Sequence, residues 1–274
     1  MDRVKTAVLL AATLALVPCA SADETTFCTR YIRSLPFTIT TQAHYCFDRN
    51  LSTAITAGAA ITINADFVLL DLNNFKLSGS AAGTGTLAIG IYANNRSNLT
   101  IRNGNVRGFA YGILIEGADT TSSRNVTVER NALDGNTVAG ITVFGSRYSI
   151  RDNQVYNTGG TTSTAAYNCG PQPPTMIGIS TLGQRNTLGC ETGGYGEVVG
   201  NTVANTFPDG LSGSGLLISI AALNGIVANN RVMTQKPSIA FPAIVGTVCR
   251  DNTVLDAAGP AYNCEQLVGV NSDY

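Results

Sequence analysis

Charged residues recur at one position of a short repeated pattern, and their types suit chemistry on acidic sugars. The position follows the first apolar residue of each copy and holds Asp71, Arg102, Glu129, Arg151, Val199, Ala228 and Arg250. If successive copies stack as neighbouring strands, the first four residues alternate in sign. They then form either a ladder of surface ion pairs, each contributing about 0–1 kcal/mol, or a site for a sugar acid. In such a site Arg holds the substrate carboxylate while a carboxylate or Tyr moves a proton. We favour the ion-pair ladder.

Other exposed residues are candidates for binding or proton transfer. The polar ones outside the repeated position are Glu116, Asp119, Arg124, Asp134 and Tyr156. A second exposed column, predicted from Gly-aliphatic strand starts, contains Tyr92, Leu114, Thr142, Ser180 and Leu217. This column is apolar enough to need cover, either by a long loop or by a partner or saccharide chain. Tyr92 and Tyr156 are the candidate ligand-binding residues.

The repeated pattern itself predicts the fold. An apolar residue is followed by Asn three positions later and by another apolar residue two further on, and Gly104 replaces the Asn in one copy. The Asn column contains Asn73, Asn131, Asn153, Asn201, Asn230 and Asn252. Copies that cannot bury their own apolar face must stack on their neighbours, and the strands between them alternate with period two. The sequence therefore predicts an all-β, single-stranded parallel β-helix with capped ends.

Two features of the repeat leave alternatives open. The recurrent Asn either adopts the left-handed conformation of a sharp corner or stacks its amide on the Asn residues above and below, and the two roles are compatible. The intervals between column positions are 31, 27, 22, 48, 29 and 22 residues. The interval of 48 is either two coils or one coil with an insertion.

The ends of the chain break the repeat. Arg3, Lys5 and the apolar stretch 6–17, followed by small residues, predict a signal peptide at 1–22. Residues 23–50 are predicted to form an N-terminal cap, 51–256 the β-helix with a loop insertion near 157–195, and 257–274 a C-terminal cap or tail. The expected location is secreted or periplasmic, with no membrane span after cleavage of the signal peptide.

Six cysteines remain after residue 22, and they allow 15 pairings. Short loops favour the disulfides Cys28–Cys46, Cys169–Cys190 and Cys249–Cys264. A metal site is the alternative, but the chain has no CxxC pair and His44 is its single histidine. His44 has no identifiable partner in the sequence. We therefore expect disulfides in an oxidising compartment, with no metal and no cofactor.

The charge balance excludes one class of partner. The chain has 17 Lys and Arg against 18 Asp and Glu, and only 13% of its residues are charged. It lacks the basic patch that binding to nucleic acid requires. The expected partner is a polysaccharide or a cell-surface component.

Two segments carry a family resemblance: Ile61–Gly79, which reads ITINADFVLLDLNNFKLSG, and Asn98–Gly108, which reads NLTIRNGNVRG. They resemble coils of bacterial secreted right-handed parallel β-helix repeat proteins of the pectate-lyase-like superfamily. The resemblance implies a right-handed parallel β-helix over about residues 28–256. It does not carry an activity, because the Asp-Asp pair, Gly-His-Gly, Asp-Pro-His-Glu and Arg-x-Pro-x-x-Arg motifs are missing.

Three functions follow as hypotheses. The favoured one is a protein that binds carbohydrate or a surface partner along the solenoid face. The second is a polysaccharide lyase or epimerase acting on uronic-acid polymers through Asp71, Arg102, Glu129 and Arg151. The third is a structural component of an envelope or matrix.

Overall fold

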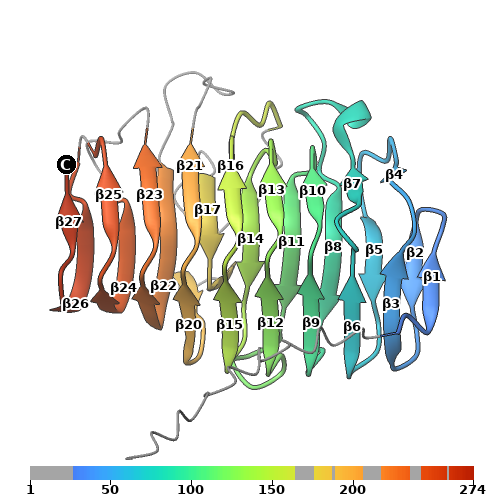
Figure 1. The fold of residues 1–274 in the computed structure, drawn as a ribbon, viewed down its shortest axis with the longest axis horizontal. Helices are drawn as coiled ribbons and strands as arrows, with labels where there is room; N and C mark the ends of the chain where they lie inside the picture. The colour runs from blue at the N-terminus through green and yellow to red at the C-terminus, as the bar shows by residue number, and fades with distance from the viewer. Residues whose placement is uncertain (1–26, 164–175, 187–188, 206–216, 235–241, 258) are drawn as a thin grey trace, which may run out of the picture.

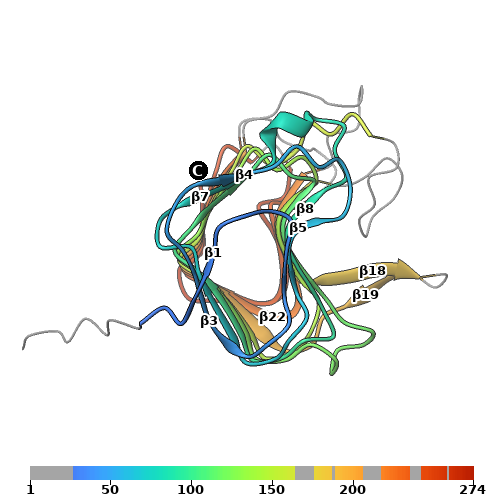
Figure 2. The same cartoon turned by 90° about the vertical axis from the view of Figure 1, so that its right-hand side faces the viewer.

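The computed structural model describes residues 27–163, 176–186, 189–205, 217–234, 242–257 and 259–274. The predicted signal peptide therefore lies outside the described residues. The described chain winds into an elongated parallel β-helix whose strands run side by side along its length (Figure 1). Its cross-section has three sides, seen along the axis in Figure 2. The all-β, parallel β-helix fold predicted from the sequence is confirmed.

Two faces of the β-helix belong to one long parallel sheet of 16 described strands. The first face contains β1 (Arg30–Ile32), β3 (Ala43–Phe47), β6 (Val68–Asp71), β9 (Leu99–Arg102), β12 (Val126–Glu129), β15 (Tyr148–Arg151) and β20 (Gly196–Val199). The second face contains β2 (Phe37–Ile39), β5 (Ala59–Ile63), β8 (Ile89–Asn94), β11 (Tyr111–Glu116), β14 (Ala139–Val143) and β17 (Met176–Ser180).

Longer strands join these two faces near the C-terminal end. They are β22 (Leu217–Ala228), β24 (Ile244–Arg250) and β26 (Tyr262–Val268). The start of β22 pairs with β17 on the second face, and its end pairs with β20 on the first. The two faces thereby become one continuous sheet that turns a corner.

The third face is a separate nine-stranded parallel sheet. Its strands are β4 (Leu51–Ser52), β7 (Lys76–Ser78), β10 (Asn105–Arg107), β13 (Ala132–Asp134), β16 (Gln154–Tyr156), β21 (Thr202–Asn205), β23 (Arg231–Thr234), β25 (Thr253–Leu255) and β27 (Ser272–Asp273). A single 3₁₀ turn, η1 (Ser80–Ala82), follows β7 within the described residues. Each complete coil visits the first, third and second faces in turn.

The interval of 48 residues is one coil with an insertion. Ile150 on β15 pairs directly with Val198 on β20, so no further coil separates them on the first face. Part of the inserted chain forms an antiparallel hairpin of β18 (Leu182–Asn186) and β19 (Gly189–Thr192). The hairpin projects from the body of the β-helix (Figure 2).

The core consists of three inward columns, one from each face, and every member is fully buried. On the first face the column is Leu70, Ile101, Val128, Ile150, Val198, Val227 and Cys249. On the second face it is Ile61, Ile91, Ile113, Ile141, Ile179, Ile220 and Ile244. On the third face it is Leu77, Val106, Leu133, Val155, Val203, Val232 and Val254. Burial of each such side chain contributes about 1.5–3 kcal/mol.

A ladder of buried amides runs along one corner of this core. The side-chain oxygen of each Asn accepts hydrogen bonds from the backbone N–H and the side-chain amide of the Asn one coil before, at 2.9–3.2 Å. Each side-chain amide also donates to a backbone carbonyl of a neighbouring strand. The members are Asn131, Asn153, Asn201, Asn230, Asn252 and Asn271. This amide ladder satisfies polar groups that would otherwise be unpaired in the core.

The sharp corner is formed one residue earlier than the sequence suggested. Positive φ angles occur at the residue before five of the six ladder positions, namely Arg130, Asp152, Gly200, Asn229 and Asp251, and also at Asn103 before Gly104. The ladder residues themselves are absent from the positive-φ positions. Of the six Asn residues predicted for the column, only Asn73 has a positive φ, of 47°. The left-handed role is therefore wrong for the other five, and the stacking role describes them.

Asn73, placed in this column from the sequence, lies outside the ladder. Four residues separate Asp71 from Lys76, whereas two separate their partners Arg102 and Asn105. The longer corner moves Asn73 out of register, and its amide donates to Phe47 O at 2.9 Å. The ladder instead stops at Gly104, whose N–H donates to Asn131 Oδ1. A Cβ at Gly104 would lie 2.5 Å from the Leu72 side chain, so the position has no room for Asn.

On the last described coil, Tyr262 and Asp273 end two of the three core columns, whereas Leu267 ends the first-face column. Asp273 pairs with Val254 and so occupies the next position of the third-face column. The hydroxyl of Tyr262 donates to Ser272 O at 2.7 Å, and burial together with the charge of Asp273 raises the pKa of Tyr262 to about 12. Asp273 is exposed, and a charged residue on a terminal strand discourages pairing with further strands. The predicted boundaries of both caps remain predictions.

The amide ladder predicts a specific cost for removing one rung. In Asn153→Ala, the Asn131 N–H loses its acceptor and Val128 O loses its donor. At about 1–3 kcal/mol for each buried group left unpaired, the free energy of unfolding should fall by about 3 kcal/mol, measured by urea denaturation. Asn263→Ala, at an exposed position of β26, is the matched control and should change it by less than about 0.5 kcal/mol. Equal losses in the two variants would contradict the ladder's role.

Candidate functional site

The charged column lies on the outward side of the first face. Asp71, Arg102, Glu129 and Arg151 are direct register partners on four successive strands. The same row continues through Val199, Ala228 and Arg250. The alternation of sign in the sequence is thus an alternation in space.

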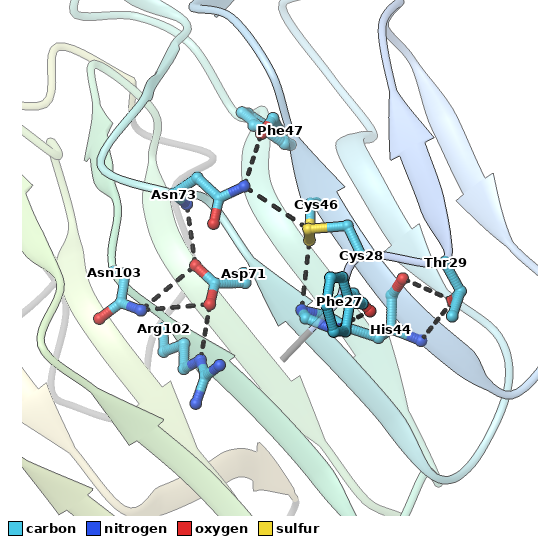
Figure 3. Close-up of a disulfide and its surroundings, with 10 residues drawn as sticks. All are labelled: Phe27, Cys28, Thr29, His44, Cys46, Phe47, Asp71, Asn73, Arg102 and Asn103. Carbon is cyan, nitrogen blue, oxygen red and sulfur yellow. Dashed lines mark hydrogen bonds and ion pairs between the residues drawn. A yellow bond between two sulfur atoms is a disulfide. The ribbon is translucent and has the colours of Figure 1, made fainter. Parts of the chain in front are cut away.

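Asp71 is fully engaged by its neighbours. Its side chain is only 6% exposed and accepts a hydrogen bond from Arg102 Nε at 2.7 Å. Asn103 Nδ2 lies 3.2 Å from both carboxylate oxygens, and the backbone N–H of Asn73 donates at 2.9 Å. Figure 3 shows these contacts around Asp71. A buried carboxylate whose oxygens already accept from a guanidinium and two further donors is poorly placed to reach a substrate proton.

Glu129 holds two arginines at once. Its Oε1 lies 2.7 Å from Arg130 Nη2, and its Oε2 lies 2.6 Å from Arg151 Nη2 and 2.9 Å from Arg151 Nε. The Glu129 side chain is 8% exposed, whereas those of Arg130 and Arg151 are 54% and 50% exposed. We call these three residues the Arg130–Glu129–Arg151 cluster. It has a net charge of +1, with the carboxylate inside and both guanidinium groups at the surface.

The cluster is suited to binding an anion. A guanidinium presents several N–H donors in a planar fork that matches carboxylate, sulfate or phosphate oxygens. Because Glu129 already fixes one edge of each guanidinium, less side-chain freedom remains to be lost on binding. Arg130 was missed from the sequence because it is the left-handed corner residue after β12, outside the strand positions compared. The sequence feature that could have identified Arg130 is its position directly after Glu129.

The second column, predicted to be exposed, lies on the outward side of a different face, where Leu114 and Ser180 are in fact buried. Tyr92, Leu114, Thr142 and Ser180 are register partners on β8, β11, β14 and β17. Leu217, expected to follow them, pairs instead with Met176, and Ala221 occupies the next place in the column. The Gly-aliphatic pattern placed β22 out of register here because Ser219 stands where earlier strands have Gly. Strand β18 of the inserted hairpin contacts β14 and β22 at this end of the column.

Tyr92 forms one polar contact within this column. Its hydroxyl donates to Glu116 Oε2 at 2.8 Å. Burial, the hydrogen bond to Glu116 and the charge of Glu116 raise the pKa of Tyr92 to about 12. The phenol is therefore protonated at neutral pH and acts as a hydrogen-bond donor, not as a base.

Tyr156 belongs to the third face and does not meet Tyr92. Its hydroxyl donates to Gln154 Oε1 at 3.1 Å on the same strand. Its partner Asp134 forms an ion pair with Arg107 at 3.3 Å. Asp119 lies in an exposed loop, where hydrogen bonds from Thr121 and Ser122 lower its pKa to about 2. The candidates from the sequence are therefore distributed over separate surfaces and do not form a single site.

Two of the three predicted disulfides are present, Cys28–Cys46 and Cys249–Cys264. Cys169 lies outside the described residues, and so does the predicted pair Cys169–Cys190. His44, for which the sequence suggested no partner, lies with its Nε2 3.2 Å from Cys46 Sγ (Figure 3). The two residues are two positions apart in β3, so strand alternation alone places them on the same side of the sheet.

No protein-family model and no curated protein matches the chain. One similar solved structure is the crystal structure of the Dettilon tailspike protein (gp208), at 13% sequence identity and a TM-score of 0.34. The match covers 89% of this chain and 60% of the tailspike chain. Within the described residues, no helix has the length and apolarity needed to cross a membrane.

The contact between Tyr92 and Glu116 predicts a titration. Glu116→Gln removes the negative charge that opposes ionisation of Tyr92, so the pKa of Tyr92 should fall from about 12 but stay above its ordinary value, because burial is the largest cause of the shift. Tyrosinate absorbance measures this change. The variant Tyr92→Phe lacks the ionisation of Tyr92, so comparison with the wild type distinguishes the Tyr92 transition from that of Tyr262. An unchanged pKa in Glu116→Gln would contradict the contact.

The same shift has a consequence for stability. A tyrosine with a raised pKa in the folded state stabilises the protein fully below its unfolded value of about 10. This contribution is lost as the pH rises towards about 12. Urea denaturation should therefore show a steeper alkaline loss of stability in the wild type than in Tyr92→Phe. Parallel pH profiles for the two proteins would argue against a raised pKa.

Proposed function

We propose that this protein is a secreted or periplasmic β-helix that binds acidic carbohydrate without catalysing a reaction on it. The observation that carries the proposal is the Arg130–Glu129–Arg151 cluster, in which a buried carboxylate holds two half-exposed guanidinium groups on one face. The carboxylates of a uronic-acid polymer are the ligands we assign to these donors. The two disulfides support an oxidising compartment.

The surroundings of the cluster support a sugar as the ligand. Thr127 and Ser149 lie side by side on the same outward surface, two residues before Glu129 and Arg151 respectively. Both are half-buried, and Ser149 Oγ donates to Glu197 Oε1 at 2.8 Å. A flat strand surface with guanidinium and hydroxyl groups can pair with both the carboxylates and the hydroxyls of an extended saccharide.

The contacts favour binding over a lyase or epimerase at this surface. Proton abstraction needs a base that can reach the substrate, whereas Asp71 and Glu129 are both buried and both accept hydrogen bonds from arginine. Their geometry is that of anions that position cations. The amide ladder and core columns would equally serve a structural envelope protein, but such a role gives no reason for two surface guanidiniums fixed on one carboxylate.

Binding to polygalacturonate tests the proposal. Arg130→Gln and Arg151→Gln each remove one charged donor, and charge-assisted hydrogen bonds contribute about 1.5–3 kcal/mol. Each variant should therefore weaken binding about tenfold or more in isothermal titration calorimetry. Arg231→Gln removes the same charge from an exposed position on the third face and should leave the affinity unchanged.

The ligand provides a second control. Polygalacturonate with its carboxylates methyl-esterified should not bind, because the groups assigned to the arginines are neutral. Equal affinity for both polymers, or equal effects of Arg151→Gln and Arg231→Gln, would contradict the proposed site. Formation of unsaturated products by the wild type, abolished in Arg151→Gln, would favour a lyase instead.

A further inference from the structure

Three potential metal ligands gather at the N-terminal end of the first face. The sulfurs of Cys28 and Cys46 and one nitrogen of His44 all lie within 4.8 Å of one another. In the folded protein the two sulfurs are joined as a disulfide. Figure 3 shows His44 beside this disulfide. Thiolate and imidazole are the ligands that Zn²⁺ prefers in proteins.

The surroundings of His44 fix its proton on one ring nitrogen. Nδ1 lies 3.1 Å from the carbonyl oxygen of Phe27, and because a carbonyl can only accept, Nδ1 carries the hydrogen. In the neutral ring the lone pair is then on Nε2, the atom 3.2 Å from Cys46 Sγ. Histidines that ligate metals are commonly oriented in this way, with the second nitrogen donating to a carbonyl or carboxylate.

The positions of the ligands do not depend on the disulfide alone. His44 and Cys46 lie on β3 and pair with Leu69 and Asp71 of β6. Cys28 precedes β1, and the adjacent Thr29 donates from both its N–H and its hydroxyl to His44 O, at 3.0 and 2.8 Å. Asn73 Nδ2 lies 3.7 Å from Cys28 Sγ, where an N–H can stabilise negative charge on sulfur. Opening the disulfide would therefore leave the three side chains close together.

We propose that reduction of Cys28–Cys46 converts this cluster into a Zn²⁺ site formed by Cys28, His44 and Cys46. Two molecules of a low-molecular-weight thiol supply the electrons: the S–S bond breaks, two cysteine thiols form, and the reductant leaves as its own disulfide. Zn²⁺ then binds the two sulfurs as thiolates with release of their protons. The imidazole Nε2 is the third ligand, and a water or an external group takes the fourth position.

The test uses the full chain reduced with excess thiol, desalted without oxygen and titrated with Co²⁺ as a spectroscopic probe, followed by displacement with Zn²⁺. The reduced wild type should bind one equivalent with a thiolate-to-cobalt charge-transfer band, and the oxidised protein should not. Cys28→Ser should lose most of the band. His44→Ala should weaken binding at least tenfold, as loss of a metal-site partner does.

A matched control uses the second disulfide, Cys249–Cys264, which belongs to no group of potential metal ligands among the described residues. The double variant Cys249→Ser/Cys264→Ser should keep the reduction-dependent band. Circular dichroism of each reduced variant shows whether the β-helix is intact. The proposal is overturned if the reduced wild type gives no charge-transfer band, if His44→Ala and Cys28→Ser bind as tightly as the wild type, or if reduction unfolds the chain and Zn²⁺ does not restore it.

Discussion

The structure depends on keeping successive coils in register, and the buried amide ladder is the interaction that does this most specifically. An apolar column alone specifies the stacking less sharply, because it tolerates replacements of one aliphatic side chain by another at modest cost. A buried amide tolerates none, since each unpaired donor or acceptor costs about 1–3 kcal/mol. From Asn131 to Asn271, each rung bonds both the backbone and the side chain of its neighbour. The ladder thus links the core to the exact pairing of strands on the surface.

That pairing produces the surface chemistry. Glu129 meets Arg151 only because β12 and β15 pair with these residues opposite each other. A slip by one residue would direct alternate side chains inward and bury charge in the core. The charged column is therefore a consequence of stacking, and its buried carboxylates act by holding cations. The half-exposed guanidinium groups of Arg130 and Arg151 are therefore the charged groups of the cluster that contact solvent.

Much of this arrangement could be predicted from the sequence, because strand alternation and a repeated pattern are local signals. They identified the parallel β-helix and the alternation of Asp71, Arg102, Glu129 and Arg151. They failed where a corner changes length, since nothing in the pattern shows that the chain after Asp71 has two extra residues. Asn73 was therefore placed in the ladder, and Leu217 was misplaced where β22 begins without the usual Gly.

Other features were missed because they depend on contacts between coils or on the corner. Arg130 is a corner residue, and its role follows only from the reach of its side chain back to Glu129. Asn271 was missed because Asp273 stands where the pattern requires an apolar residue. His44 and Cys46 share a side of β3, which alternation could have indicated, but the approach of Cys28 depends on the pairing of β1 with β3.

Amide hydrogen exchange followed by NMR tests the central role of the ladder most directly. The backbone N–H groups of Asn131, Asn153, Asn201 and Asn230 each donate to a buried side-chain oxygen at a corner, outside the regular strand ladders. If these bonds hold the coils in register, the four amides should exchange as slowly as those of the central core strands. Exchange at the rate of exposed corner amides would show that the coils are held together without the ladder, and would contradict this account.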